Sequence, residues 1–371
     1  MAMFIVKPWY RKKDDAIYGA EWAGTSDPSW TRTDAAVGFS DPNPYYSGMS
    51  TAPSSPFDNI MPWSGMRRVT DANAGELVEI PKFYYKWTRD GIKMKLQISM
   101  SAFDGSHVSP AHADRGDGIG ERDYVYVGRY HCSSYNYKSI TGYTPKVNIT
   151  RATARTAIHN LGSNIWQFDY AMWWTVNMLY LVEFANWNSQ AMIGYGRGNG
   201  SSTENSGASD TMPYHTGTIK SNRTTYGVGI QYRYIEDWWA NVLDWVDGIY
   251  YSGLNVYNIA NPANFSDSTG GTYTGQRVNA GPDYTKSWNN PTATGFEYAL
   301  HPNVNGNGAT ETTYITDQSH YYSTDTNAYV GGSYNQGQGG GAFCILCSGS
   351  SATAASHGCR LMVLPPSRLA A

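Results

Sequence analysis

Charged side chains are scarce in this sequence of 371 residues, because Asp, Glu, Lys and Arg together make up only 15% of it. Disordered chains are rich in charge and poor in aromatic residues, whereas 14% of this chain is Phe, Trp or Tyr, so the composition predicts a folded chain. The formal net charge is −3. Since no basic excess is present to neutralise phosphates, we expect no nucleic-acid partner.

Long hydrophobic runs are also missing. No stretch of about 18 consecutive apolar residues occurs, so the sequence predicts no membrane-spanning helix and no insertion into a membrane. The first residues, MAMFIVKPWYRKKDD, carry their charges after a short apolar patch instead of before it. This order is wrong for a secretory signal peptide, and we expect none here.

Cysteine is rare, and its spacing does not indicate a metal site. Cys344 and Cys347 form one C-x-x-C inside an apolar, strand-like run, whereas a zinc site needs a second pair or histidines at matching spacing. A redox pair would stand at the beginning of a helix. We therefore expect these two residues, like Cys132 and Cys359, to be buried, reduced thiols.

Catalytic motifs are absent as well. No G-x-S-x-G lies between a strand and a helix, and the glycine-rich run 337–341 lacks the lysine of a phosphate-binding loop. Histidines and aspartates gather in one place only, where a solvated polar loop is favoured over a metal site. We expect no enzyme, no metal and no cofactor. The residues of that His/Asp cluster are Asp104, His107, His112, Asp114 and Asp117.

Glycine (39 residues) and tyrosine (30 residues) are abundant instead. The first 75 residues are rich in proline and turns, which predicts a small β-rich N-terminal module over 1–75. A second domain is predicted over 76–371, because confident strands begin at residue 76. The predicted strands cover residues 76–80, 83–87, 93–99 and 124–130.

Two helices are predicted in the middle of the chain. Thr150 or Thr153 is a suitable N-cap for a short helix that ends at Gly162. A longer helix is predicted from about Asp169 to Trp187, and its apolar residues cover most of the circumference, so it should be largely buried. The following residues, 194–235, form a polar loop that is long enough to suggest a function.

The C-terminal segment combines short apolar strands with polar loops. Residues 342–347 and 359–363 are predicted strands, and the segments around them are rich in Gly, Ser, Asn, Gln and Tyr. A rigid scaffold that presents such residues is typical of a recognition surface. Alternation along the first strand puts Phe343, Ile345 and Cys347 on one side, and Cys344, Leu346 and Ser348 on the other.

Four motifs resemble the formylglycine-generating-enzyme-like branch of the C-type lectin fold. Residues 240–245 (ANVLDW) resemble its G-N-V-W-E-W core motif, and residues 358–361 (GCRL) resemble its closing G-F-R strand. Residues 331–335 (GGSYN) are similar to its G-G-S-W-N motif, and the helix end at 182–190 resembles the second helix of phage-encoded members. The resemblance implies an α+β, C-type-lectin-like domain behind the N-terminal module.

Within that branch, the C-terminal segment looks like the hypervariable end of proteins diversified by retroelements. The reference type is the major tropism determinant, a receptor-binding protein of a phage tail. The resemblance implies a homotrimer in the virion, made in the host cytoplasm and assembled with other tail proteins. Residues 20–38 also resemble the openings of phage tail proteins, so the N-terminal module is expected to serve virion attachment or oligomerisation.

The implied ligand is a bacterial cell-surface protein or glycan, bound at the C-terminal face. Tyrosine provides a large contact area at low entropic cost, and Asn, Gln and Ser supply hydrogen bonds. In the resembled family, the side of the strand that carries Cys344 joins this face. The expected ligand-binding residues are Tyr321, Tyr322, Ser333, Tyr334, Asn335, Gln336, Gln338, Cys344, Leu346 and Ser348.

Two other functions remain open from the sequence. The enzyme branch of the resembled family oxidises a cysteine of sulfatases with its own reactive cysteines and copper, so a formylglycine-generating type of oxidase is one alternative. A catalytic thiol needs access and a low pKa, whereas the cysteines here lie in apolar, strand-like segments. The other alternative is a purely structural tail component, which would bind no ligand and tolerate changes in its loops.

Overall fold

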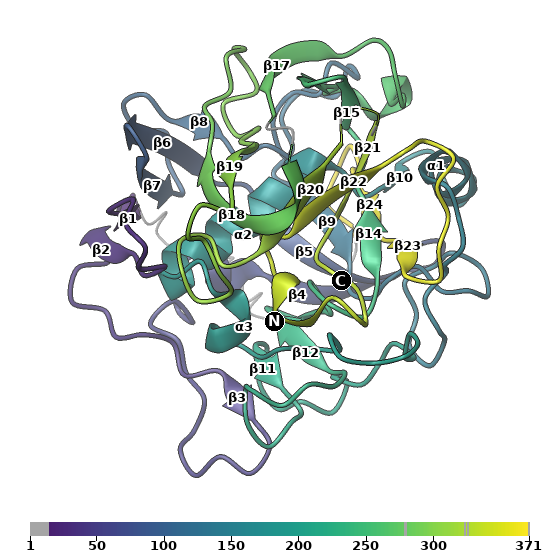
Figure 1. Cartoon of the computed structure of the whole chain (residues 1–371). Helices are drawn as coiled ribbons and strands as arrows, with labels where there is room; N and C mark the ends of the chain where they lie inside the picture. The colour runs from purple at the N-terminus through teal and green to yellow at the C-terminus, as the bar shows by residue number, and fades with distance from the viewer. Residues whose placement is uncertain (1–14, 278–279, 323, 325, 370–371) are drawn as a thin grey trace, which may run out of the picture.

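The computed structural model describes residues 15–277, 280–322, 324 and 326–369 (Figure 1). Residues 1–14, on which the expectation of no signal peptide rests, lie outside the described residues. The described chain is mostly β-sheet with few helices, which agrees with the α+β class. Its helices are α1 (Arg151–His159), α2 (Tyr170–Phe184) and α3 (Ser189–Met192), with short 3-10 turns η1 (Trp63–Gly65), η2 (Pro262–Asn264) and η3 (Gly337–Gly339).

The described strands form five sheets, three of which involve the N-terminal part of the chain. The first has the order β2 (Thr31–Asp34), β1 (Tyr18–Trp22), β7 (Lys93–Ser99), β6 (Tyr84–Asp90), β8 (His107–Val108). The second has the order β10 (Ile165–Gln167), β24 (Leu361–Val363), β9 (Tyr124–Gly128), β5 (Gly75–Pro81), β4 (Arg67–Asp71). The third has the order β13 (Ile235–Glu236), β12 (Ile230–Tyr232), β11 (Gly217–Thr218), β3 (Tyr45–Tyr46).

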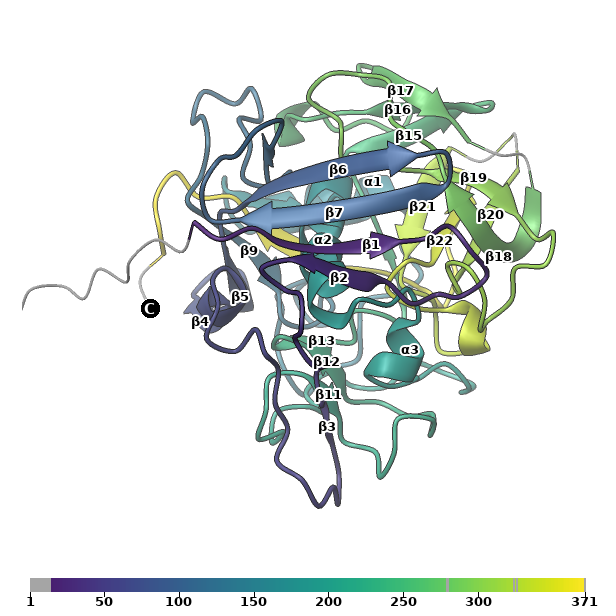
Figure 2. The ribbon, with the colours of Figure 1, turned by 90° about the vertical axis from the view of Figure 1, so that its left-hand side faces the viewer.

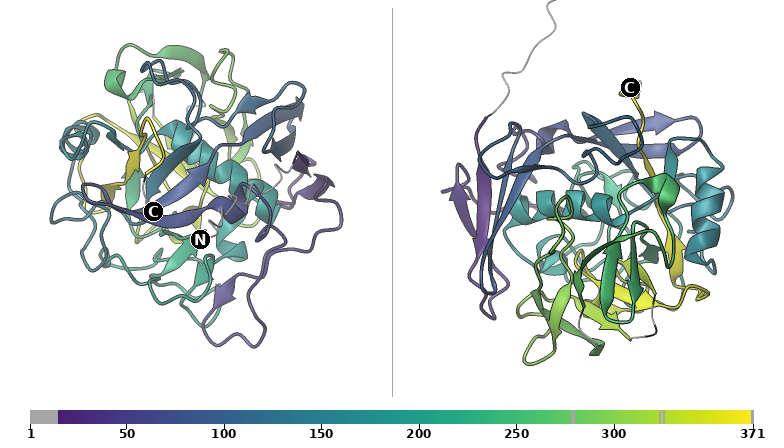
Figure 3. Two further views of the ribbon diagram at one scale, coloured as in Figure 1. Left: turned by 180° about the vertical axis from the view of Figure 1, so that it is seen from behind. Right: turned by 90° about the horizontal axis from the view of Figure 1, so that it is seen from above.

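The other two sheets are built from the C-terminal half. The larger one has the order β19 (Pro302–Asn305), β18 (Ala280–Trp288), β20 (Gln318–Tyr321), β22 (Ile345–Ser348), β21 (Asn327–Val330), β14 (Leu243–Trp245), β23 (His357–Cys359). The smaller one has the order β15 (Ile249–Ser252), β16 (Asn255–Asn258), β17 (Thr272–Gln276). The first sheet and α1 lie on opposite flanks of the molecule (Figure 3).

The predicted elements of the middle region are confirmed. The four predicted strands correspond to β5, β6, β7 and β9. The hydroxyl of Thr150 accepts a hydrogen bond from the Thr153 amide at the beginning of α1, and the carboxylate of Asp169 accepts one from the Met172 amide at the beginning of α2. These caps satisfy amide groups that the first turn of a helix leaves without partners.

Helix α2 lies in the centre of the molecule, and all of its residues are buried (Figure 2). It packs against β1 and β7 on one side. Its buried amide and carboxylate side chains have partners. Asn177 donates to the carbonyl of Ala342 at 2.9 Å and accepts from the indole of Trp238 at 2.9 Å. The carboxylate of Glu183 accepts hydrogen bonds from Arg233 at 2.6 and 2.8 Å. A helix that is buried all round requires such partners.

The N-terminal segment shares its sheets with the rest of the chain. Strand β1 pairs with β7, β3 pairs with β11, and β4 pairs with β5. The predicted boundary between residues 75 and 76 falls inside β5. Trp22 and Trp63 belong to the main core cluster. Residues 15–75 are therefore not a module with separate sheets, and their role in attachment or oligomerisation stays a prediction.

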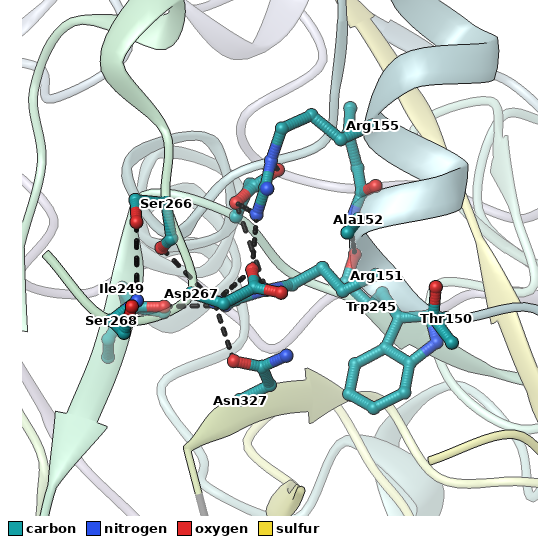
Figure 4. A network of polar contacts seen from close by, with 12 residues as sticks. Thr150, Arg151, Ala152, Arg155, Trp245, Ile249, Ser266, Asp267, Ser268 and Asn327 are labelled. Carbon is teal, nitrogen blue, oxygen red and sulfur yellow. Dashed lines mark hydrogen bonds and ion pairs between the residues drawn. The ribbon is translucent and has the colours of Figure 1, made fainter. Parts of the chain in front are cut away.

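Helix α1 is held to the C-terminal half by two arginines (Figure 4). The fully buried Arg151 donates to the side chain of Asn327 at 2.8 Å and to that of Asp267 at 3.0 Å. Arg155 forms a bidentate pair with Asp247 at 2.6 and 2.7 Å and also reaches Asp267. These charged groups compensate one another inside the protein. In the described parts of the chain, no helix is both long and apolar enough to cross a membrane.

Buried histidines make the stability of the fold dependent on pH. Burial lowers the pKa of both His112 and His301 from the ordinary 6.5 to about 3. The unfolded chain then binds protons more readily than the folded chain between pH 6.5 and 3. The stability contributed by these neutral rings is complete above about pH 6.5 and is lost progressively toward pH 3, by up to about 1.4 kcal/mol per pH unit for each histidine.

We therefore expect the variant His112→Gln to show a shallower loss of unfolding free energy between pH 6.5 and 4.5 than the unmodified protein. Urea unfolding at a series of pH values measures this slope. An unchanged slope in His112→Gln would contradict the assignment of a neutral, buried ring at this position.

Candidate ligand-binding surface

Two of the segments that carry the sequence motifs, 240–245 and 358–361, meet at Arg360, which is fully buried. Its guanidinium donates to the carboxylate of Asp244 at 3.0 Å, to the carbonyl of Gly128 at 2.9 Å, and to the carbonyls of Glu236 and Asp237 at 3.0 and 2.9 Å. One side chain between β23 and β24 thus holds β9, β13 and β14 together. This network fixes the frame on which the C-terminal loops are built.

The buried charges around Arg360 balance each other. Burial by itself would raise the pKa of Asp244, but its contacts with His131 and Arg360 outweigh burial, so the pKa of this carboxyl is lowered. Burial lowers the pKa of His131, which leaves its ring neutral near pH 7. Arg360 is therefore the cation that keeps Asp244 ionised. The side-chain partners of Asp244 are thus His131 and Arg360.

Asn241 joins the frame to two loops that are far apart in the sequence. Its amide oxygen accepts from the backbone of Glu204 at 3.0 Å, and its amide nitrogen donates to the carbonyl of Glu204 at 3.2 Å. The backbone carbonyl of Asn241 accepts a hydrogen bond from the backbone amide of Tyr334 at 3.0 Å. Asn241 therefore satisfies backbone groups of both loops. The residue places the predicted functional loop 194–235 beside the C-terminal segment.

The two loops also bond to each other directly. The amide of Gly337 donates to the carbonyl of Gly198 at 2.7 Å, and the amide of Gly200 donates to the carbonyl of Tyr334 at 2.6 Å. The side chain of Gln338 donates to the hydroxyl of Tyr195 at 2.8 Å. Residues 195–200 and 334–338 therefore form one continuous surface.

Further tyrosines extend this surface. The ring of Tyr226 lies 4.9 Å from that of Tyr195, and Tyr284 on β18 is close enough to Tyr226 for their hydroxyls to interact electrostatically. Burial raises the pKa of Tyr226, and burial with nearby Glu311 raises that of Tyr284 to about 12, so both hydroxyls stay protonated and able to donate. The tyrosine surface is defined by Tyr195, Tyr226, Tyr284, Tyr334, Asn335, Gln336 and Gln338.

Part of the expected ligand-binding set lies on this surface. Asn335 is exposed, while Tyr334, Gln336 and Gln338 are partly exposed. The amide of Gln336 also donates to the side chain of Gln318 at 2.7 Å. Ser333 is buried and donates to the side chain of Asn335 at 2.8 Å, so it orients a surface residue and is not itself displayed.

The expectation that one side of β22 is displayed is wrong. Cys344 is fully buried and Leu346 is 6% exposed, so neither side chain reaches the surface. Alternation along the strand is correct, because Phe343 and Ile345 lie in the main core cluster while Cys344 and Leu346 lie in a second one. The second cluster covers the side that was expected to face outward. Tyr321 is fully buried too and is excluded in the same way.

Tyr322 and Ser348, the last two of the expected ligand-binding residues, lie at the opposite ends of β20 and β22 from the tyrosine surface. Strands β20 and β22 run parallel, with Ser319 opposite Ile345, so Tyr322 and Ser348 both follow at the end away from Gln318. Tyr322 is 51% exposed and its ring contacts that of His320 at 4.4 Å. The structure therefore does not place Tyr322 and Ser348 with Tyr334.

Tyr195, Tyr226 and Tyr284 are not among the ligand-binding residues predicted from the sequence. The length of the polar loop 194–235 was a signal for the first two, but no local pattern pairs that loop with residues 334–338. Tyr284 lies within a strand and gave no signal at all. Only the fold brings the three side chains together.

The cysteines are buried and carry no disulfide, as expected. Burial raises the pKa of Cys132 and Cys344 well above its ordinary value. Both thiols therefore remain protonated, which is the opposite of the condition that a nucleophilic or metal-binding cysteine requires. Among the residues that the structure describes, no group of His, Cys, Asp and Glu has the arrangement of a metal site.

Comparison with known proteins gives no further guidance, because no family model matches this sequence and no curated protein matches it significantly.

The glycines of the turn before η3 are required by its geometry. Gly332 has φ of 87°, a left-handed conformation, and a Cβ atom there would lie 2.6 Å from Cα of Gly340. We expect Gly332→Ala to lower the free energy of unfolding by about 1–3 kcal/mol, because the added methyl meets rigid backbone in a strained conformation. Urea unfolding measures the change.

Gly349 provides the matched control for that variant. A Cβ atom at this position meets no atom within 4 Å, and the residue is not in the left-handed region. Gly349→Ala should therefore alter the free energy of unfolding by less than about 0.5 kcal/mol. Equal effects of the two substitutions would show that the turn before η3 is not constrained as described.

Proposed function

We propose that this protein is a receptor-binding protein of a phage tail, which recognises a bacterial surface protein or glycan without catalysis. The observation that carries the proposal is the tyrosine surface: two loops, bonded to each other and to a buried frame, present three partly exposed tyrosines with Asn and Gln side chains, and strand β18 adds a fourth tyrosine. Rigid aromatic side chains beside adaptable polar ones are the composition of known recognition surfaces.

Pre-organisation supports the proposal. Backbone hydrogen bonds fix residues 198–200 against residues 334–337, so the surface loses little conformational entropy when a ligand binds. The ring of Tyr195 packs against that of Tyr226, and its hydroxyl accepts a hydrogen bond from Gln338. A purely structural loop would not need to combine these features with partial exposure.

The contacts between motif segments support a C-type-lectin-like fold as the finer description of this α+β chain. Arg360 of the G-C-R-L segment pairs with Asp244 of the A-N-V-L-D-W segment at 3.0 Å. Asn241 of the latter bonds to Tyr334 of the G-G-S-Y-N segment at 3.0 Å. In the proposed assembly, the protein acts as a homotrimer in the virion together with other tail proteins.

No observation favours the oxidase alternative. That chemistry needs an accessible, low-pKa thiol, whereas all four cysteines are buried and the pKa of Cys132 and Cys344 is raised. A structural tail component remains distinguishable by experiment, because it would bind no cell and would tolerate substitutions on the tyrosine surface.

The test is binding of the labelled, full-length protein to a panel of bacterial strains. We expect strain-selective binding that is lost when Tyr334, Asn335, Gln336 and Gln338 are changed to Ala. Contact residues at the centre of an interface often contribute about 2 kcal/mol or more each, so the combined change should weaken binding by well over about thirtyfold. The same variant should keep most of its thermal stability, since it retains the buried frame.

Tyr273→Ala is the matched control, because this side chain is 44% exposed and lies on β17, on the side of the molecule away from η3 (Figure 1). It should bind the same strains as the unmodified protein. Selective binding that survives the fourfold substitution would move the site elsewhere. Absence of binding to every strain would refute the proposal. Copper-dependent cysteine oxidation, lost in Cys359→Ser or Cys344→Ser, would then establish the oxidase instead.

A further inference from the structure

Tyr135 and Tyr143 form an exposed aromatic pair outside the tyrosine surface. Their rings are stacked, with centroids 5.4 Å apart and an angle of 17° between the planes, and the two residues are 71% and 42% exposed. Because one face of the Tyr135 ring lies toward Tyr143, its high exposure leaves the other face open to solvent. Single aromatic residues at a surface are ordinary, whereas a contiguous patch marks an interaction site.

The backbone around this pair is fixed by hydrogen bonds between loops. The amide of Ser134 donates to the carbonyl of Thr144 at 2.9 Å, and the hydroxyls of these two residues lie 3.0 Å apart. The amide of Ser206 donates to the carbonyl of Tyr143 at 3.0 Å, and the amide of Gly142 donates to the carbonyl of Ser206 at 2.8 Å. The two rings are therefore held on ordered backbone, so little conformational entropy is lost when a ligand packs on them.

Residues 200–206 connect the pair to the tyrosine surface. At the beginning of this segment, the amide of Gly200 donates to the carbonyl of Tyr334, and at its end the amide of Ser206 donates to the carbonyl of Tyr143. The chain from residue 200 to residue 206 spans at most about 22 Å even when fully extended. One elongated ligand therefore reaches from Tyr334 to the pair.

The surface between the two groups of tyrosines is polar and has no uncompensated charge. Residues 199–206 (NGSSTENS) contain no apolar side chain. Glu204 is the one charged residue in this segment, and its carboxylate pairs with Arg197 at 2.8 Å. The exposed residues of the segment are Asn199, Ser201, Ser202 and Asn205.

These features fit a polysaccharide better than a protein. A protein interface has an apolar core from which water is excluded, and residues 199–206 offer no side chains for such a core. A sugar ring has a C–H face that packs on an aromatic ring, and it has hydroxyl groups that bond to Ser, Thr, Asn and Gln side chains. A chain of linked sugars repeats this combination along its length.

We propose that the tyrosine surface and the Tyr135–Tyr143 pair bind one bacterial surface polysaccharide together, with the sugar chain running along residues 199–206. This inference rests on the proposed function. It narrows the ligand from a surface protein or glycan to an extended glycan, and it adds the pair as a second contact at the far end of the site.

The class of ligand is tested on cells of a strain that the unmodified protein binds selectively. One sample is treated with proteinase K, which removes surface proteins, and another with sodium periodate, which cleaves the vicinal diols of sugars. We expect binding to survive proteinase K and to fall by at least about tenfold after periodate. Binding that is lost after proteinase K and unchanged after periodate would overturn the inference and leave the receptor-binding function intact. Absence of binding to every strain would overturn both.

Variants of the pair test the second contact. The double substitution of Tyr135→Ala with Tyr143→Ala should weaken binding to untreated cells by about tenfold or more, because it removes both rings. The melting temperature should stay within about 2 °C of the original, as expected for surface substitutions. The matched control combines Tyr135→Phe with Tyr143→Phe, which keeps both rings, and should bind within about threefold of the unmodified protein.

An equal loss of binding in the Phe and Ala variants would show that the ring faces are not the contact and would overturn the inference. Undiminished binding in the Ala variant would overturn it as well. If the fourfold substitution on the tyrosine surface still abolishes binding in that case, the proposed function stands without the second contact.

Competition with sugar fragments tests whether one chain spans both groups of tyrosines. The probe is polysaccharide purified from the bound strain, partly hydrolysed and separated by length on a gel-filtration column. Long fragments should inhibit cell binding of the unmodified protein at least about tenfold better than short ones at equal mass, because the second contact becomes intramolecular. The Ala variant of the pair should not distinguish the two lengths. Equal inhibition of the unmodified protein by short and long fragments would overturn the inference.

Discussion

The complete burial of α2 is the constraint on which the rest of the structure depends. A helix with no solvent-exposed face has to be surrounded by other elements, and a carboxylate or amide side chain that it carries needs a partner inside the protein. Glu183 therefore requires Arg233, and Asn177 requires Trp238 and the backbone of Ala342. These partners come from widely separated parts of the chain. The helix thereby fixes where the loop 194–235 and the C-terminal segment lie relative to the first sheet.

A second buried network, around Arg360, holds the surface loops in fixed positions. Arg360 and Asp244 close the frame, and Asn241 holds both loops of the tyrosine surface through backbone hydrogen bonds. Recognition by partly exposed tyrosines depends on such support, because a flexible loop would lose its conformational entropy on binding. Buried charged residues thus keep the backbone of the loops rigid, while the Tyr, Asn and Gln side chains at the surface remain available to contact a ligand.

The fold could be predicted from the sequence where the signals are local. Residue type and position narrowed the first N-cap to Thr150 or Thr153 and predicted the beginning of α2 at about Asp169, and the structure has Thr150 and Asp169 as the caps. The candidate site was predicted in part: residues 334–338 are at the surface, but Cys344 and Leu346 are not. Alternation shows that a strand has two sides, but it does not show what covers each of them.

By itself, the sequence determined strands β5, β6, β7 and β9, both main helices, the burial of α2 and the polar, tyrosine-rich character of the C-terminal loops. These properties follow from periodicity, capping and composition, which act over a few residues. Only the tertiary structure decided that β1 pairs with β7, that a second core cluster covers β22, and that Tyr195 lies beside Gln338. Such contacts join segments that local sequence patterns do not connect, and their free energy depends on the packing of the whole chain.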